Sequence, residues 1–141
     1  MSKLVTYMGT VYPWQCDHVG HMNVMWYVGK FDEATWTFFH HLGVTPTYLR
    51  QANRGMAAVQ QTIQYRKELM AGDVLRVESQ LLDMRDKVVR FVHIMMNVEE
   101  ETPAAICELT GVHMDTAMRK STPFPPAIRE KAAALIAAAG A

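Results

Sequence analysis

Neither sign of charge is in excess in this sequence of 141 residues, because 14 Lys and Arg residues balance 14 Asp and Glu residues. Proteins that bind nucleic acids or membrane surfaces through many phosphate contacts need a surplus of cations. The balance therefore argues against both partners. It still allows a small anionic ligand that a few local Arg or Lys side chains would contact.

Cysteines are also scarce, and long apolar runs are absent. Cys16 and Cys107 form no Cys-x-x-Cys pair and have no metal-ligand spacing. The first residues, MSKLVTYMGTVYPW, lack an apolar stretch of signal-peptide length, and no segment approaches the roughly 18 apolar residues of a membrane span. These features predict a soluble protein of the reducing cytoplasm.

What the sequence does have is an apolar content of 50%, enough for one domain with a substantial core. The residues from Val24 to Leu42 have helical periodicity, with Asn23 as the expected N-cap and Gly43 as the C′ residue. So wide an apolar face predicts a helix that is surrounded on most sides. Its polar positions form one narrow stripe: Lys30, Glu33, Thr37, His40 and His41.

The pattern then changes to one typical of strands, in four segments rich in Val, Ile and Leu that are separated by the turns MAGD, MRDK and EEETP. Strands joined by short turns pair antiparallel, so one curved antiparallel sheet is expected to cover the apolar helix in an α+β fold. The predicted strands are 4–14, 56–68, 73–83, 88–98 and 104–118; the further predicted helices are a short one within 44–53, with Thr45 as cap, and a terminal one at 127–139.

Directly ahead of the long helix, the stretch DHVGHMN places an acid, two histidines, a glycine and an asparagine close together. This Asp-x-x-Gly-His-x-Asn pattern, followed by VMWYVGKFDEA and later by IQYRKELMAGDVLRVES, resembles the acyl-CoA thioesterases of the 4-hydroxybenzoyl-CoA thioesterase type. The resemblance covers about residues 5–120. One departure is Gln15, which stands where many relatives carry an acid two residues before the catalytic aspartate.

The resemblance implies a hotdog fold, in which a curved antiparallel sheet of about five strands wraps around one long central helix. Residues 1–141 would form a single hotdog domain, with a core at about 5–120 and a helical tail at about 124–139. Members of the family pair two sheets edge to edge, so a homodimer or homotetramer is implied, with the site between protomers.

Asp17 is the predicted catalytic residue. Thioester hydrolysis needs an oxygen nucleophile or a base that activates water, together with groups that stabilise the developing oxyanion. A helix N-terminus offers unpaired N–H groups and partial positive charge, and Asp17 stands just upstream of one. The resemblance implies that the carbonyl oxygen points at the backbone N–H near Val24. A purely structural role for Asp17 in the loop is the alternative, since Asp is common near helix starts.

The neighbours of Asp17 have supporting roles in this interpretation. Gly20 is expected to let the backbone turn sharply beside the ligand. His21 and Asn23 are expected to orient the loop and hydrogen-bond to the thioester or water, and ordinary loop hydrogen bonds are the alternative. The first turns of the helix, around Tyr27, are expected to line an acyl pocket as well as the core.

Three further possibilities concern metals, thiols and phosphates. A metal site built on Asp17, His18 and His21 lacks a compact second set of ligands, so no metal or organic cofactor is predicted. Cys16 is interpreted as a small buried neighbour rather than a nucleophile. The basic residues that would contact the phosphates of coenzyme A, with a solvated hairpin face as the alternative, are Arg85, Lys87 and Arg90, with Arg119 and Lys120 further on.

The function predicted from these residues is hydrolysis of an acyl-CoA to a free acid and coenzyme A. One alternative is a hotdog dehydratase or hydratase that acts on a 3-hydroxyacyl or enoyl thioester through His21 and an acid across the dimer. The other is a non-catalytic module that binds an acyl thioester intact. The residue pattern does not specify the acyl group.

Overall fold

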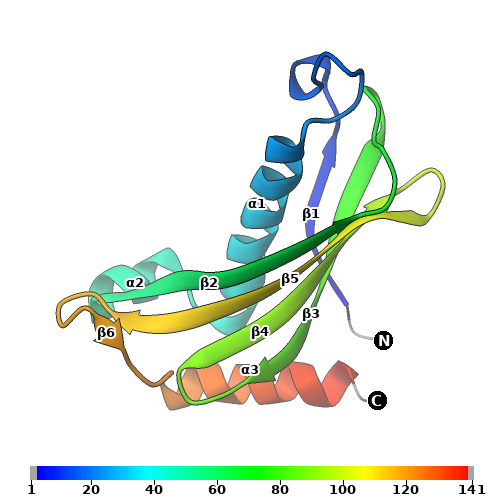
Figure 1. Ribbon diagram of the computed structural model, residues 1–141. Helices are drawn as coiled ribbons and strands as arrows, with labels where there is room; N and C mark the ends of the chain where they lie inside the picture. Colours follow the sequence, from blue (N-terminus) through cyan, green and yellow to red (C-terminus); the bar gives the residue numbers. More distant parts are fainter. Residues whose placement is uncertain (1–2, 140–141) are drawn as a thin grey trace.

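The computed structural model describes residues 3–139, which fold as one curved sheet with helices on one side of it (Figure 1). In chain order the elements are β1 (Leu4–Thr10), the 3-10 turn η1 (Pro13–Gln15), α1 (Val24–Leu42), α2 (Pro46–Ala52), β2 (Arg54–Tyr65), β3 (Val74–Met84), β4 (Val88–Asn97), β5 (Thr102–Asp115), β6 (Lys120–Ser121) and α3 (Pro126–Ala139).

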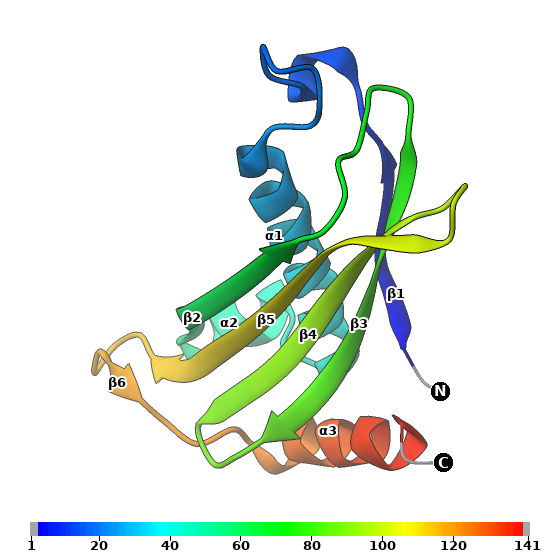
Figure 2. The same cartoon turned by 45° about the vertical axis from the view of Figure 1, so that its right-hand side comes forward.

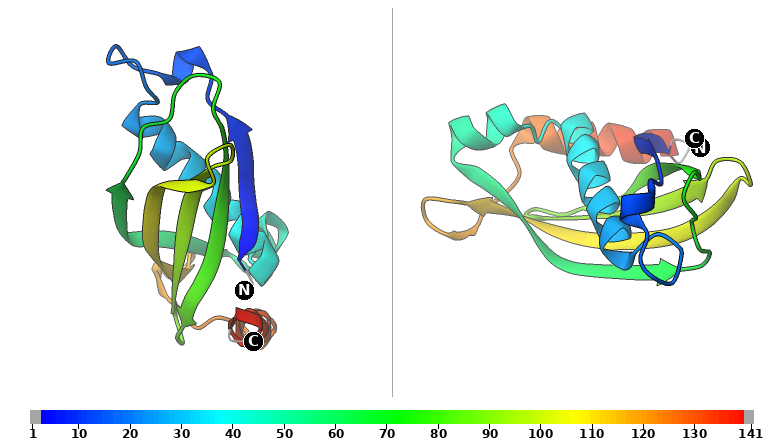
Figure 3. Two further views of the ribbon diagram at one scale, coloured as in Figure 1. Left: turned by 90° about the vertical axis from the view of Figure 1, so that its right-hand side faces the viewer. Right: turned by 90° about the horizontal axis from the view of Figure 1, so that it is seen from above.

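The sheet has the strand order β1-β3-β4-β5-β2, with the short β6 added to β5, and every pairing is antiparallel. It curls so that α1 lies along its concave side, as Figures 2 and 3 show. This is the predicted hotdog arrangement, and the five long strands are those expected from the sequence. Some details differ. The first strand ends at Thr10, because Pro13 begins the turn η1, and β6 was not predicted. Strands β2 and β5 span Arg54–Tyr65 and Thr102–Asp115 instead of 56–68 and 104–118.

Helix α1 has the boundaries that its capping residues predict. The Asn23 side chain accepts a hydrogen bond from the Met25 N–H, and Gly43 ends the helix in the left-handed region with φ 86°. The buried face of α1 packs against the sheet, where Phe38 stacks on Phe91 of β4 with ring centroids 5.2 Å apart. The helix is therefore fixed at both ends and along one face.

The prediction that the polar stripe of α1 is exposed is wrong at one position. Lys30 is buried, with 2% of its surface exposed, and its Nζ lies 3.2 Å from the Tyr7 hydroxyl and over the Tyr7 ring. The expectation of a surrounded helix also fails within one chain, because apolar residues at its start and middle are exposed. These are Val24, Met25 and Trp36.

The central strands alternate as predicted, with Leu75, Val77 and Leu81 buried. One buried position on β4 is a histidine, His93, which bonds through Nδ1 to Ser79 on β3 and through Nε2 to the Thr35 hydroxyl on α1, at 2.8 Å. Burial lowers the pKa of His93 to about 3, so the ring is neutral in the folded protein. This polar link ties the helix to the sheet.

Strand β2 forms one edge of the sheet, and its outer side faces no other strand of the described residues 3–139 (Figure 1). Its central residues, Ala58 to Thr62, are all exposed, although one face of a sheet strand is usually buried. At the far end of the sheet, α3 packs against β3 and the last turn of α1. Within residues 3–139, no helix is both long and apolar enough to span a membrane.

Candidate active site

Asp17 lies in a tight loop that the backbone holds closed. The Gly20 N–H donates to the Asp17 carbonyl oxygen, and the Asp17 N–H donates to the His21 carbonyl oxygen. A single β-bridge between Cys16 and Met22 closes the base of the loop. Gly20 has φ 103°, a conformation that suits glycine, so the predicted sharp turn is present.

Two donors hold the Asp17 carboxylate. Its Oδ1 accepts from the Val19 N–H at 2.9 Å, and its Oδ2 accepts from the Asn23 side-chain amide at 3.1 Å. These hydrogen bonds, that of Val19 above all, lower the pKa of Asp17 below its ordinary value. The group is therefore an ionised carboxylate at neutral pH, which is the form that acts as a nucleophile or a base.

Asn23 connects this carboxylate to the start of α1. Its Oδ1 accepts from the Met25 N–H at 3.0 Å while its Nδ2 donates to Asp17, so one side chain is both cap and anchor. The Val24 N–H stands at the first helical position, where no intrahelical acceptor exists. No acceptor for it is found among residues 3–139. Asn23 thus links the Asp17 carboxylate to the residue just before this N–H.

The loop borders an open groove of about 190 Å³ formed with the segment that follows β2. Tyr27 lies on its floor, donates to the Lys67 carbonyl oxygen at 3.2 Å and meets the Tyr65 ring edge-on, with centroids 5.2 Å apart. His21 also faces this segment, with Nε2 3.6 Å from a carboxylate oxygen of Glu68. At that distance the two side chains are close without a hydrogen bond, and the backbone of His21 is what ties this residue into the loop.

Arg66 and Lys67 line the same groove and are not among the residues predicted from the sequence. Both side chains are exposed, so they place positive charge beside the loop. The available signal was a basic pair at the end of a long strand, within the stretch IQYRKEL. It could not be interpreted without the fold, because only the closing of the sheet around α1 brings residue 66 to the helix start.

The basic residues that were predicted lie elsewhere in this chain. Arg85 and Lys87 are in the hairpin between β3 and β4, beside α3 and at the opposite end of β3 from the loop (Figure 1). Arg90 is on β4, where it pairs with Asp83 at 2.8 Å and with Glu108 at 3.3 Å. One chain does not bring these three residues to Asp17, and their role in binding coenzyme A stays a prediction.

Cys16 is half-buried, rather than buried as expected, and its sulfur lies 3.9 Å from the Tyr12 carbonyl oxygen. Cys107 is buried in the sheet, and burial raises the pKa of its thiol to about 12. Neither thiol is therefore given a catalytic role. Residues 3–139 contain no group of three or more His, Cys, Asp or Glu side chains placed to hold a metal ion.

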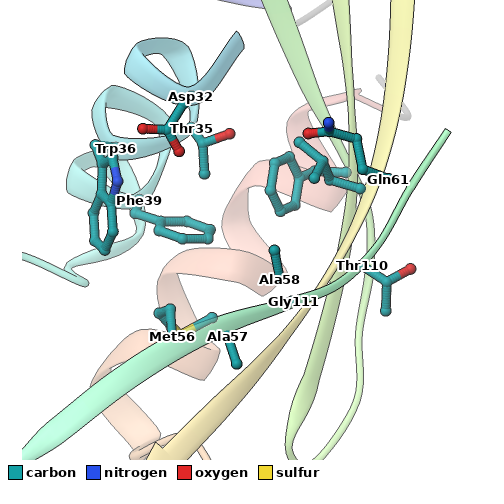
Figure 4. A pocket seen from close by; sticks show the side chains of 12 residues that line it. Asp32, Thr35, Trp36, Phe39, Met56, Ala57, Ala58, Gln61, Thr110 and Gly111 are labelled. Carbon is teal, nitrogen blue, oxygen red and sulfur yellow. The ribbon is translucent and has the colours of Figure 1, made fainter. Parts of the chain in front are cut away.

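A second hollow lies between α1 and the edge strand β2 (Figure 4). We call it the α1–β2 pocket; its volume is about 120 Å³. The helix contributes Asp32, Thr35, Trp36 and Phe39, and the sheet side is mostly small or apolar. The pocket is remote from Asp17 of the same chain, because Trp36 is about 18 Å further along the helix axis than Val24. The sheet-side residues are Met56, Ala57, Ala58, Gln61, Phe91, Leu109, Thr110 and Gly111.

Comparison with known proteins assigns the chain to a family. The family model of the thioesterase-like superfamily matches residues 11–132, which include the loop, α1 and all the long strands after it. The chain belongs to this superfamily. The family resemblance is thereby confirmed, and so is the prediction of a thioester hydrolase at the level of the family.

A curated relative of this thioesterase-like chain agrees with the family assignment. A curated protein of Agrobacterium fabrum, an L-carnitine dehydrogenase/betainyl-CoA thioesterase, is 33% identical over 112 residues, which are 79% of this chain and 23% of that protein. The chain thus spans less than a quarter of the length of this relative.

Two solved structures share the fold. A Staphylococcus aureus protein in complex with CoA has a TM-score of 0.88 at 22% identity, covering 96% of this chain and 85% of the other. A 1,4-dihydroxy-2-naphthoyl-CoA thioesterase from Synechocystis has a TM-score of 0.82 at 16% identity, with 94% and 97% covered. The hotdog fold predicted from the sequence is therefore confirmed.

Proposed function

We propose that this chain hydrolyses an acyl-CoA thioester to a free acid and coenzyme A, with Asp17 as the reacting carboxylate. The observation that carries the proposal is the geometry around Asn23. This one side chain anchors an ionised carboxylate and caps the helix whose first N–H, that of Val24, has no acceptor among residues 3–139. Hydrolysis of a thioester requires both groups at one carbonyl: the carboxylate, or the water that it activates, attacks the carbon atom, and the N–H donates to the oxygen.

The N–H of Val24 polarises the thioester carbonyl and stabilises the negative charge that develops on its oxygen, aided by the positive end of α1. Asp17 then acts in one of two ways. As a nucleophile, it adds to the carbonyl carbon and expels the coenzyme A thiolate, and water hydrolyses the resulting anhydride. As a general base, it removes a proton from the attacking water, and the same thiolate leaves. Neither route uses a metal or an organic cofactor.

The site is completed by a second copy of the chain in this proposal. Strand β2 presents an exposed edge with unpaired backbone groups, and such an edge is a template for pairing with another strand. Apolar residues of α1 that are exposed in one chain would be covered at the same time. We assign a homodimer, or a tetramer built from such dimers, working in the cytoplasm, where Cys16 and Cys107 stay as free thiols.

Coenzyme A carries several phosphate charges, which Lys and Arg side chains bind well. Arg66 and Lys67 line the groove that the loop borders. Arg85, Lys87 and Arg90 remain candidates for contacts that a second copy would bring together. Exchanging the Arg66 and Lys67 charges for Gln should raise KM for an acyl-CoA while leaving kcat nearly unchanged.

The test is thiol release from a panel of acyl-CoAs by wild-type protein and by Asp17→Ala. The panel includes betainyl-CoA, because the Agrobacterium fabrum relative carries that substrate in its name. The proposal expects free coenzyme A and free acid in equal amounts from wild type. More than a tenth of the wild-type kcat in Asp17→Ala would overturn the assignment of Asp17.

The same assay separates the two alternatives. A hydratase acting through His21, whose neighbour Glu68 is an acid, would change enoyl absorbance without releasing thiol. His21→Ala would then be inactive while Asp17→Ala kept activity. A binding module would retain the thioester intact in both variants. The proposal expects His21→Ala to be impaired less than Asp17→Ala, because His21 supports the loop rather than breaking the bond.

A further inference from the structure

We infer that the α1–β2 pocket receives a small cationic acyl group, of the trimethylammonium type, from a thioester bound at Asp17 of the partner chain. The inference rests on the proposed function and adds the substrate class. It depends on three properties of the pocket: its charge and rings, its size, and its place relative to the edge strand.

The pocket carries one formal charge, and that charge is negative. Asp32 is the only ionisable side chain among the lining residues. Within residues 3–139 its carboxylate has neither an ion-pair partner nor a side-chain hydrogen bond. By contrast, Glu78 and Asp83 on β3 and Asp86 in the hairpin after it each pair with an Arg side chain. A carboxylate that no protein cation neutralises, at the mouth of an apolar pocket, favours a cationic ligand.

Aromatic rings stand next to this carboxylate. Trp36 lies one turn below Asp32 on α1, and Phe39 meets it edge-on with ring centroids 5.5 Å apart (Figure 4). Trp36 is 43% exposed, so its ring is accessible to a ligand. Quaternary ammonium groups bind over such rings because they have no N–H to donate and are attracted to the negative ring face. A phosphate would find no Lys or Arg in this lining and would be repelled by the Asp32 carboxylate.

The size of the pocket suits a small group. Its volume of about 120 Å³ compares with the roughly 150 Å³ of an engineered protein cavity that holds benzene. A long fatty acyl chain would not fit, whereas a compact branched group would. Gln61 and Thr110 add a few polar atoms at its wall, which suffices to orient a ligand, whereas the Thr35 hydroxyl is already bonded to His93.

The edge strand explains how a pocket remote from Asp17 in one chain can serve a partner's site. When an edge strand pairs with its own copy about a two-fold axis, the two strands run antiparallel. If the two strands pair over their exposed centres, residues 58–62, the Tyr65 end of β2, beside the groove at the Asp17 loop, lies opposite the Met56 end of the partner's β2, beside the partner's α1–β2 pocket. The acyl group needs only to cross this short junction.

The experiment compares two substrates of nearly equal shape, betainyl-CoA and 3,3-dimethylbutyryl-CoA, in which carbon replaces the charged nitrogen. Asp32→Asn removes the charge and keeps the size of the side chain. We expect kcat/KM for betainyl-CoA to fall by about tenfold or more, and kcat/KM for the neutral analogue to change by less than about twofold. Trp36→Leu should act in the same direction. Since the cation also activates its own thioester, each variant is compared with wild type separately for each substrate.

Glu33→Gln is the matched control, because it removes one negative charge from the neighbouring position of α1 and Glu33 does not line the pocket. It should leave both substrates within about twofold of wild type, which excludes a general effect of net charge. Molecular mass and Tm are measured for every variant. An equal loss of kcat/KM for both substrates in Asp32→Asn would overturn the inference. That result is expected if the pocket serves only as a contact between copies. Cleavage of other acyl-CoAs but not of betainyl-CoA would overturn it while leaving the proposed function standing; no cleavage of any acyl-CoA would overturn both.

Hybrid dimers test whether the two acids of one site come from different chains. Asp17→Asn protomers supply an intact Asp32, and Asp32→Asn protomers supply an intact Asp17. If the inference holds, mixing and exchanging these protomers creates one fully wild-type site per hybrid dimer. Activity on betainyl-CoA then rises above that of the unmixed Asp32→Asn protein. If the mixture is only as active as the Asp32→Asn protein that it contains, both acids of one site belong to the same chain, and the inference is overturned.

Discussion

Replacing Asn23 separates the stability of α1 from the chemistry of the loop, because this side chain serves both. Its Oδ1 caps the helix through the Met25 N–H at 3.0 Å, and its Nδ2 holds Asp17 at 3.1 Å. Asn23→Ala removes both bonds. Loss of an N-cap costs about 1 kcal/mol, which in a chain of this size lowers Tm by about 3 °C. The loosened carboxylate should also lower kcat by about tenfold.

Asn23→Asp gives the more informative result. The variant keeps the capping oxygen and adds a negative charge at the positive end of α1, so Tm should stay above that of Asn23→Ala. It also puts an oxygen in place of the nitrogen that donates to Asp17. The like charge should raise the pKa of Asp17, whereas the wild-type contacts lower it.

The assay is the pH profile of kcat/KM, measured by thiol release, together with thermal unfolding. Because the ionised form of Asp17 is active and its pKa is lowered, wild-type activity should stay level as the pH falls from 7 to about 5. In Asn23→Asp the acid limb should move to higher pH. An unchanged acid limb, or equal Tm losses in the Ala and Asp variants, would refute the double role of Asn23.

Three other predictions concern stability, assembly and metal dependence. Burial lowers the pKa of His93 to about 3, so below about pH 6.5 the unfolded state binds a proton at this ring and the folded state does not. The free energy of unfolding should therefore fall by about 1.4 kcal/mol for each unit by which the pH is lowered below this value. Urea titrations at pH 7 and pH 5.5 should show a smaller difference in this free energy for His93→Gln than for wild type. Light scattering should give at least twice the single-chain mass of 16.0 kDa, and Val59→Asp, which puts like charges on the β2 edge, should shift the mass toward one chain. Activity should survive treatment with EDTA, and a loss that zinc restores would contradict a metal-free mechanism.

The fold was predictable because its signals are local. The caps Asn23 and Gly43 define α1 to the residue, and alternating burial defines β3 and β4. Lys30 was misplaced because a helical polar position does not reveal that the Tyr7 hydroxyl of a distant strand will receive it. A lysine can bury its methylene groups against apolar neighbours in this way while its ammonium group reaches a polar partner.

The candidate site was predictable only in part, for the same reason. The Asp17 loop is contiguous in sequence, so its hydrogen bonds follow from local spacing. Arg66 and Lys67 join it through the closure of the sheet, which no local pattern encodes. The α1–β2 pocket combines side chains from one helix and three strands, and its proposed connection to Asp17 requires a second copy of the chain.

The central claim is that the carboxylate of Asp17 breaks the thioester bond, and it is tested most directly by Asp17→Asn. This variant keeps the shape of the side chain but removes its charge and nucleophilic oxygen. The measurement is single-turnover thiol release from one acyl-CoA that the wild type cleaves, with Tm and molecular mass recorded alongside. The account predicts a loss of about a hundredfold or more in rate, with the fold and assembly unchanged. A rate above a tenth of wild type in a correctly folded Asp17→Asn protein would contradict it.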